Sequence, residues 1–414
     1  MDTIKKIGAQ ALEASRKMAN LSTAKKNAVL NAMADAVDQR RGPIQEANAQ
    51  DLAAARAAGL APAMLDRLTL TDARFDAMVN GIREVAALPD PVGKKIWKRT
   101  RPNGLLIEKR RVPLGVIAII YESRPNVTAD AAVLCIKTAN AVILRGGKEA
   151  IRSNLAIAQA LQAGGESAGM PRHALQLVET TDREAVRELV QLSDCVDVVI
   201  PRGGESLIRA VVENARVPVL KHYKGVCHVF VDALSDFDQA LAIIDNAKCQ
   251  RPSACNALET LLVHQAAAPA FLPLLAALAE RRRVELRGCQ ATRAILPAVL
   301  PATEEDWTTE YLDLILSVRV VKDLKAAIRH INTYGSHHSD AIVTADPRNA
   351  KKFLKEVDSA AVYVNASTRF TDGGEFGMGA EMGISTDKLH ARGPMGLEEL
   401  TTYKYVVTGT GHIR

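Results

Sequence analysis

The sequence predicts an α/β fold in which two parallel-sheet domains carry a protruding β-hairpin. With 414 residues, the chain is longer than one ordinary hydrophobic core accommodates, so two domains are expected. From residue 114 onward, short apolar runs alternate with segments of helical periodicity, which is the pattern of parallel sheets covered by helices. Before that point, two charged segments flank Asn103-Gly104, a strong signal for a hairpin turn.

Residues 1–87 are expected to form helices, because their apolar side chains recur at helical spacing. The pattern is interrupted at Gly42-Pro43 and ends at the Leu-Pro-Asp-Pro run of residues 88–91. The hairpin at 96–111 follows, and its many charges indicate that it projects from the body. A basic hairpin also suits nucleic acid, but this one lacks the interleaved aromatic side chains that such surfaces use.

The region after the hairpin is expected to contain a first and then a second α/β domain. Right-handed crossovers place the loops that follow the strands along one edge of each sheet, where ligands bind. The first domain has expected strands at 114–120, 141–144, 175–178, 196–200 and 217–220, and expected helices at 128–139, 183–192 and 205–215. The second has expected strands at 227–231, 257–263, 315–321, 340–344 and 361–364, and a helix at 236–248. Since no low-complexity linker separates the domains, we expect them to pack closely around a cleft.

Two loops of the first domain share the order strand, Arg-Gly-Gly, helix. Glycine lets a phosphate approach the backbone N–H groups at a helix start, and a basic side chain adds charge. Neither loop matches the usual dinucleotide or nucleoside-triphosphate motif, and a tight strand-to-helix turn is the structural alternative. The residues concerned are Arg145, Gly146, Gly147 and Lys148 in one loop and Arg202, Gly203 and Gly204 in the other.

Cys255 is the candidate nucleophile. It lies in a short polar loop, residues 250–256 (Gln-Arg-Pro-Ser-Ala-Cys-Asn), between a helical and an extended run. A substrate can reach a thiol placed there, and the neighbouring Arg251 favours the thiolate, the form that attacks carbon. The alternative is a cysteine packed as a small hydrophobic side chain.

Composition limits the class of protein. The net charge of +6 is modest and only 4% of residues are aromatic, which argues against a nucleic-acid-binding protein and suits anionic small-molecule ligands. Six cysteines are scattered without a Cys-x-x-Cys pair, which fits a reducing compartment better than a disulfide framework or a structural zinc site. The longest apolar run, 266–279, is too short to span a bilayer. We therefore expect a cytoplasmic enzyme that binds neither nucleic acid nor membrane.

Two adjacent histidines, His337 and His338, suggest a metal site. No further ligand lies near them in the sequence, so a surface loop is the preferred interpretation and no metal is expected.

Several segments resemble the aldehyde dehydrogenase superfamily, over nearly the whole chain. Residues 310–318 (Glu-Tyr-Leu-Asp-Leu-Ile-Leu-Ser-Val) are similar to its Glu-x-Phe-Gly-Pro-x-Leu-Ser-Val block, and residues 396–404 are similar to its C-terminal block. Cys255 falls where the superfamily has its nucleophile. Further stretches resemble the members of the superfamily that reduce L-glutamyl 5-phosphate, namely residues 121–128, 144–150, 250–256 and 388–397.

The resemblance implies an aldehyde dehydrogenase-like fold and the NADPH-dependent reduction of L-glutamyl 5-phosphate to L-glutamate 5-semialdehyde and phosphate, the second step of proline biosynthesis from glutamate. Cys255 would attack the acyl phosphate to form a thioester, which hydride then reduces. The oxyanion needs fixed donors, and the candidates are the Cys255 backbone N–H and the Asn126 side chain. Hydrolytic members carry a glutamate base about where this chain reads Leu-Lys-His-Tyr-Lys at 220–224. Without a carboxylate there, we expect phosphate rather than water to accept the acyl group.

The resemblance also implies contacts to cofactor and substrate. Glu310 matches the glutamate that holds the nicotinamide ribose. Arg145 and Lys148 stand near the adenosine ribose, where two cations suit the 2′-phosphate of NADP. The other expected cofactor contacts are Gly146, Gly147, Gly203 and Gly204. The candidates for the substrate's carboxylate or phosphate, each of which is alternatively a surface ion pair, are Arg124, Arg251 and Arg392.

A division of the chain follows from the same resemblance. Residues 1–96 and 114–228, with 377–399, are expected to form the NADP-binding domain, and 229–376 the catalytic domain. Residues 97–113 and 400–414 are expected to pair as an oligomerisation arm that gives a homodimer or homotetramer. Glutamate 5-kinase is a candidate functional partner. The rival functions are oxidation of a free aldehyde to an acid and, outside enzymes, a basic nucleic-acid-binding scaffold.

Overall fold

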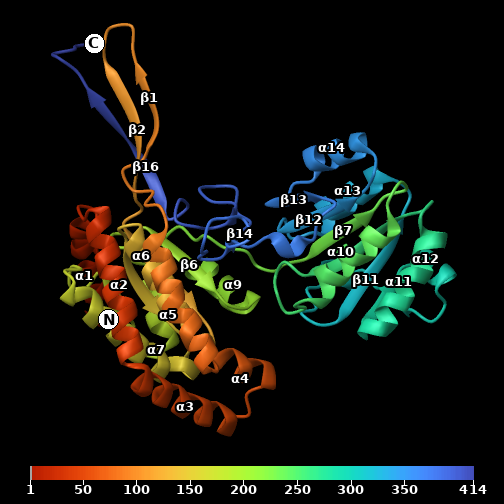
Figure 1. Ribbon diagram of the computed structural model, residues 1–414, viewed down its shortest axis with the longest axis horizontal. Helices are drawn as coiled ribbons and strands as arrows, with labels where there is room; N and C mark the ends of the chain where they lie inside the picture. Colours follow the sequence, from red (N-terminus) through yellow and green to blue (C-terminus); the bar gives the residue numbers. More distant parts are fainter. Residues whose placement is uncertain (1) are drawn as a thin grey trace. The chain divides into compact units, whose positions relative to one another are not determined.

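The computed structural model describes residues 2–414, which fall into two compact units (Figure 1). The first unit runs to Lys221 and is completed by Gly377–Gly383 and Met395–Arg414, while the second contains His222–Phe376 and Ile384–Pro394. The sequence suggested a boundary at residue 228 and assigned all of 377–399 to the first domain. The structure instead divides the chain at Lys221 and gives the segment that carries Arg392 to the second unit.

The N-terminal region of the first unit is helical. Its helices are α1 (Asp2–Met18), α2 (Thr23–Gln39), α3 (Arg41–Ala57), α4 (Pro62–Leu68) and α5 (Asp72–Ala87). Ser22 and Thr71 cap α2 and α5 by accepting hydrogen bonds from backbone N–H groups of the first turn. The interruption expected at Gly42-Pro43 lies at Arg40 instead. Proline is tolerated in the first turn of a helix, where its missing N–H would have no intrahelical partner.

A parallel sheet of order β5-β4-β3-β6 forms the core of the first unit. Its strands are β3 (Val116–Tyr121), β4 (Ala141–Arg145), β5 (Leu175–Leu177) and β6 (Val198–Arg202), and its helices are α6 (Asn126–Lys137), α7 (Ile151–Ser167), α8 (Arg183–Leu189) and α9 (Glu205–Asn214), with a 3-10 turn η1 (Lys148–Ala150). One face packs against α1, α8 and α9. Helix α6 covers the other face, where the Tyr121 hydroxyl lies 2.6 Å from Thr128 Oγ1.

The strand expected at 217–220 does not form. Val219 makes an isolated parallel bridge to Val199 and pairing stops there. Pro218 lies inside this short run and has no backbone N–H to donate, although its carbonyl accepts from Val199 N at 2.9 Å.

The expected hairpin is present and a third strand completes it. Strands β1 (Lys95–Thr100) and β2 (Leu106–Pro113) pair antiparallel, and β16 (Thr401–Thr408) pairs with the other edge of β2. The turn uses Gly104 at φ 87°, a backbone conformation that glycine adopts readily. The resulting three-stranded arm extends away from the helices of the first unit (Figure 1).

The second unit is built on a parallel sheet of order β10-β9-β11-β8-β7-β12-β13. Its strands are β7 (Cys227–Val231), β8 (Leu258–His264), β9 (Glu285–Gly288), β10 (Leu300–Pro301), β11 (Ile315–Val321), β12 (Ser339–Val343) and β13 (Ala361–Val364). Helices α10 (Phe237–Cys249) and α11 (Ala268–Arg282) pack on one face, and α13 (Leu324–Tyr334) and α14 (Pro347–Glu356) on the other. The remaining elements are α12 (Gln290–Ile295), η2 (Glu305–Thr308), η3 (Thr368–Phe370), β14 (Ile384–Ser385) and β15 (Gly393–Pro394).

None of the helices between residues 2 and 414 has both the length and the apolar character that crossing a bilayer requires. The cysteines, which all lie within that range, are free thiols.

Candidate functional site

The Cys255 loop connects the end of α10 to the start of β8, and neighbouring segments hold it in place. Ala254 N donates to Arg251 O at 3.1 Å and Ala257 N donates to Ala254 O at 2.9 Å, so the loop is a pair of successive turns. Asn256 is buried, and its Nδ2 donates to Thr371 O at 2.9 Å. Cys255 itself is partly exposed. The loop therefore presents a reachable thiol on an anchored backbone.

A close backbone approach fixes the position of the Cys255 carbonyl. A side chain on Gly225 would overlap the Cys255 carbonyl oxygen, so these two segments touch where β7 is about to begin. Gly225 N donates to Glu310 Oε1 at 2.9 Å, and Cys227 Sγ lies 3.4 Å from the same Cys255 carbonyl. The backbone that carries the thiol is therefore supported by Gly225, Cys227 and Glu310.

Two histidines lie beside the thiol. His222, Cys255 and His338 each offer a donor atom, and these atoms lie within 4.8 Å of one another. The rings of His222 and His338 meet edge to face with centroids 5.6 Å apart. The interpretation of His338 as part of a surface loop is wrong, because its side chain is fully buried at the start of β12. His337 next to it is partly exposed, with Nδ1 2.5 Å from Asp358 O.

His338 and the neighbouring Cys227 are both held neutral by burial. Burial, reinforced by His222, lowers the pKa of His338 to about 3, so its imidazole carries no charge at neutral pH. Burial raises the pKa of the Cys227 thiol well above its ordinary value. Cys227 is therefore a structural thiol that packs beneath the Cys255 loop.

Two guanidinium groups accompany the Cys255 loop. Arg251 is exposed in the loop, and Arg369 of η3 donates to Gln250 Oε1 at 3.0 Å and also to Asn256 Oδ1. Burial lowers the pKa of Arg369 and Arg251 lowers it further, while Cys255 raises it. The positive charges of Arg251 and Arg369 favour an anion beside the Cys255 loop.

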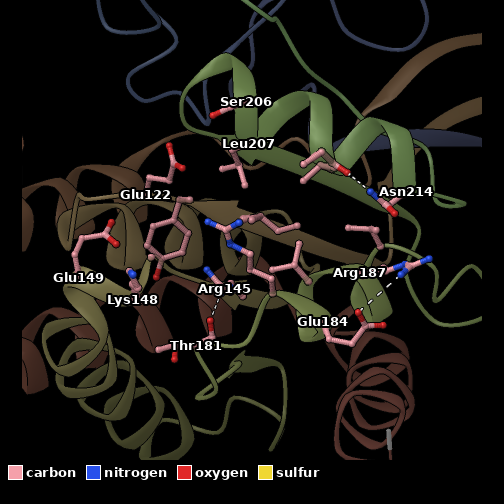
Figure 2. Close-up of a pocket in the computed structure, with 18 residues that line it drawn as sticks. Glu122, Arg145, Lys148, Glu149, Thr181, Glu184, Arg187, Ser206, Leu207 and Asn214 are labelled. Carbon is pink, nitrogen blue, oxygen red and sulfur yellow. Dashed lines mark hydrogen bonds and ion pairs between the residues drawn. The ribbon is translucent and has the colours of Figure 1, made fainter.

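A cavity of about 570 Å³ lies in the first unit beside the ends of β3 and β4 and against α8 and α9. Figure 2 shows Glu122, Arg145 and Lys148 among the side chains around it. Arg145 is buried and donates to Gly146 O and Thr181 O, each at 3.0 Å. Lys148 is exposed. Further basic lining residues are Arg183 and Arg187.

The first Arg-Gly-Gly loop lines this cavity with Arg145 and Gly147, and the second contacts the lining residue Glu122. Each glycine pair approaches another group closely. A side chain on Gly146 would overlap Asn154, which supports the tight-turn interpretation of that loop. Gly204 N, at the start of α9, donates to Glu122 Oε2 at 2.9 Å. The second loop therefore already binds a carboxylate with the backbone N–H that a phosphate would use.

Comparison with known proteins agrees with this arrangement. The profile of the aldehyde dehydrogenase family matches residues 1–292. A gamma-glutamyl phosphate reductase of Moorella thermoacetica is 58% identical over 407 residues, covering 98% of this chain and 97% of that protein. The chain belongs to the aldehyde dehydrogenase family, among its gamma-glutamyl phosphate reductases.

Two further relatives in the family extend the match. A gamma-glutamyl phosphate reductase of Xanthomonas oryzae is 57% identical and covers 100% of both chains. The crystal structure of the Thermotoga maritima gamma-glutamyl phosphate reductase superposes with a TM-score of 0.98 at 48% identity, covering 99% of each chain. The aldehyde dehydrogenase-like fold expected from the sequence is confirmed.

The structure distributes the residues expected from the family over the two units. Arg251 and Glu310 lie in the second unit together with Cys255. Arg124 lies in the first unit, as do the other expected cofactor contacts, Arg145, Gly146, Gly147, Lys148, Gly203 and Gly204. Asn126 begins α6 in the first unit, where its Nδ2 donates to Asp130 Oδ2 at 2.8 Å. Burial raises the pKa of Asp130 to about 6. Arg392 forms an ion pair with Asp358 at 2.8 Å. An ion pair was the alternative to substrate binding that the sequence left open for this residue.

The sequence did not place His222, His338 or Arg369 beside the thiol, although His338 had been considered as a metal ligand. His222 lies within the block where hydrolytic members of the family carry their base, and that position was the available signal. His338 and Arg369 are far from Cys255 in the sequence, and strand order brings them to it.

Proposed function

We propose that the protein reduces L-glutamyl 5-phosphate to L-glutamate 5-semialdehyde with release of phosphate, the second step of proline biosynthesis from glutamate. The observation that carries this proposal is the full-length likeness to gamma-glutamyl phosphate reductases, combined with a reachable Cys255. The absence of a carboxylate at residues 220–224 supports phosphate, rather than water, as the partner of the acyl group.

Cys255 performs the covalent chemistry. Its thiolate attacks the acyl carbon, the C–S bond forms and the C–O bond to phosphate breaks. The Cys255 backbone N–H and the Asn126 side chain are the proposed donors to the oxyanion, and Arg251 is a proposed binder of the anionic substrate. Reduction of the thioester carbon gives a thiohemiacetal, which releases the aldehyde and restores the thiolate. Arg124 and Arg392 remain proposed substrate contacts, the latter after giving up Asp358.

NADPH is the proposed cofactor, and it supplies the hydride when bound. The cavity in the first unit fits the adenosine part of such a dinucleotide, because Arg145 and Lys148 line it with two further arginines and suit a 2′-phosphate. Gly146, Gly147, Gly203 and Gly204 are proposed to let the pyrophosphate approach the backbone. Glu310 is the proposed partner of the nicotinamide ribose, and it would then exchange the Gly225 N–H for a ribose hydroxyl.

The reverse reaction tests the proposal, because acyl phosphates are labile. L-Glutamate 5-semialdehyde and NADP⁺ are supplied with and without inorganic phosphate, and NADPH absorbance is followed. We expect turnover that requires phosphate, is slower with NAD⁺, and falls by about 10⁴-fold or more in Cys255→Ala. Cys249→Ala is the matched control, since that thiol lies at the end of α10 outside the loop.

Turnover that is indifferent to phosphate would mean that water accepts the acyl group. Oxidation of free aldehydes to acids would then be the function. Turnover that survives in Cys255→Ala would exclude the thioester route.

The remaining expectations concern the cellular setting. We propose a cytoplasmic homodimer or homotetramer, supported by the free thiols and by the arm, whose exposed side chains include Tyr405 and Val407. Glutamate 5-kinase is proposed as the functional partner, because a labile acyl phosphate favours direct transfer from the enzyme that makes it.

A further inference from the structure

The donor atoms of His222, Cys255 and His338 converge because of the strand order in the second unit. His222 comes shortly before β7, Cys255 comes shortly before β8, and His338 comes directly before β12. Strands β8, β7 and β12 are neighbours in the sheet and run parallel. Their amino ends therefore lie side by side, and the three donor atoms come within 4.8 Å of one another.

The imidazole of His222 is arranged as that of a metal ligand usually is. His222 Nδ1 lies 2.7 Å from the Ile384 carbonyl, which can accept but not donate. Nδ1 therefore carries the proton and Nε2 the lone pair, and a backbone carbonyl is a common partner for the far nitrogen of a metal-bound histidine. His338 Nδ1 lies 2.9 Å from Ser339 Oγ.

The remaining nitrogen of His338 needs an explanation. His338 is fully buried, and its Nε2 has no hydrogen-bond partner among the described residues. Buried polar atoms are nearly always satisfied, so an orphan on a ring that lies beside a thiol and a second imidazole indicates a missing ligand.

We propose that His222, Cys255 and His338 form a binding site for Zn²⁺ that reversibly caps Cys255. Two imidazole nitrogens and one thiolate are donors that Zn²⁺ prefers, with bonds of about 2.0–2.1 Å to nitrogen and about 2.3 Å to sulfur. Tetrahedral coordination brings such donors to about 3.5 Å from one another, so modest side-chain rotations close the cluster. A water molecule takes the fourth position.

Binding changes no oxidation state. The S–H bond of Cys255 breaks, its proton goes to solvent, and a bond from sulfur to Zn²⁺ forms. The consequence for activity rests on the proposed function, because a metal-bound thiolate is no longer available to attack the acyl phosphate. The binding itself does not depend on it.

The site is tested first by metal binding to the full-length, metal-free chain without substrate. Co²⁺ is added as a spectroscopic substitute for Zn²⁺, and Zn²⁺ affinity is measured by competition with a chromophoric chelator. We expect one metal per chain, intense visible bands of tetrahedral Co²⁺, and a thiolate-to-cobalt charge-transfer band that disappears in Cys255→Ala. Zn²⁺ affinity should fall at least about 100-fold in Cys255→Ala, His222→Ala and His338→Asn.

Matched controls separate this site from general metal binding. His337→Asn and Cys249→Ala remove a neighbouring imidazole and a neighbouring thiol outside the cluster, so both should bind Zn²⁺ as the unchanged chain does. A charge-transfer band that persists in Cys255→Ala, or equal affinities in all variants, would overturn the proposal.

Alkylation of the unchanged chain provides a measurement that needs no variant, in case His338→Asn does not fold. Zn²⁺ should slow labelling of Cys255 by iodoacetamide at least about 10-fold, a chelator should restore the rate, and labelling of Cys249 should not change. Labelling of Cys255 that is equally fast with Zn²⁺ would exclude capping. If the metal binds as expected but the reductase assay fails, the error lies in the proposed function and not in the site.

Discussion

At the scale of single residues, Gly225 sets how closely the chain can pass the Cys255 loop. A methyl group there would meet the backbone of Cys255, which cannot move aside as a flexible side chain can. The same residue donates to Glu310, so its position is fixed from two sides.

Gly225→Ala should therefore lower kcat/KM at least about 100-fold and destabilise the chain by about 1–3 kcal/mol. Gly42→Ala is the control, because nothing lies near a methyl group at that helical position and a small gain in stability is expected. Phosphate-dependent turnover and urea midpoints measure both effects. Full activity in Gly225→Ala would show that the loop tolerates displacement.

Asp306 is the second residue that supports the site, because it orders the segment that leads to Glu310. Burial raises the pKa of Asp306, but hydrogen bonds from Thr303, Tyr311 and Arg287 outweigh it and lower the pKa to about 2. The Tyr311 hydroxyl donates to Asp306 at 2.6 Å. A carboxyl whose pKa is lowered by folding stabilises the protein above its unfolded pKa of 3.8 and stops doing so as the pH falls toward 2.

Asp306→Asn should cost about 2 kcal/mol at pH 6, the equivalent of the shift from 3.8 to about 2. The difference in urea midpoint between Asp306→Asn and the unchanged chain should shrink between pH 6 and pH 3. A difference that stays constant over this range would mean that the carboxylate charge is not the source of the effect.

At the scale of elements, a buried ion pair joins the two ends of the Cys255 loop. Lys248 near the end of α10 and Glu259 in β8 lie 2.6 Å apart, and both side chains are at most 1% exposed. Burial raises the pKa of Glu259 to about 7, against the opposing effect of Lys248. Removing one partner leaves the other buried without compensation.

Glu259→Gln should destabilise the chain by about 3–5 kcal/mol, because the Lys248 ammonium loses its partner in the interior. Replacing both residues, as Lys248→Met with Glu259→Leu, should recover most of this loss. Thermal unfolding of the three variants measures the effect, and the alkylation rate of Cys255 reports whether its loop has moved. A double variant as unstable as Glu259→Gln would contradict the argument.

Elements with strong periodicity could be predicted from the sequence, and weak ones could not. The strands β11 (Ile315–Val321) and β13 (Ala361–Val364) have the predicted bounds because both are rich in β-branched and other apolar residues, which favour strands. The short strands β9 and β10 were missed; β10 lies at the edge of the sheet with β9 next to it, and both are too short for their apolar residues to form a clear pattern.

The candidate site was predicted in part for a similar physical reason. Local sequence marked Cys255 and the Arg-Gly-Gly loops. The general rule places ligands at the carboxyl ends of parallel strands, and the cavity beside β3 and β4 follows it. The thiol cluster instead gathers at the amino ends of β7, β8 and β12, so His338 could be found only once the strand order was known.

At the scale of the whole molecule, the arm is the proposed contact between subunits. Its outer strand β16 exposes Tyr405 and Val407, with 56% and 54% of their surfaces accessible. Exposed apolar side chains on an edge strand are a surface to which another chain can pair.

Tyr405→Asp combined with Val407→Asp should convert the proposed oligomer to a monomer, because it places charges on that edge. Light scattering after size-exclusion chromatography measures the mass. Leu354→Asp is the control, since Leu354 is 50% exposed on α14 of the second unit and should not change the mass. A double variant with the mass of the unchanged protein would exclude the arm as the interface.

The path of the chain also sets an order of events during synthesis on the ribosome. Strand β2 is made early, but its partner β16 follows only after the whole second unit. Until then β1 and β2 form a two-stranded ribbon in which the outer edge of β2 is unpaired, a structure that is marginally stable by itself. A nascent chain therefore lacks the strand on which subunit pairing is proposed to depend. Assembly would be delayed until the Cys255 loop has been made, which would keep incomplete chains out of the proposed oligomer.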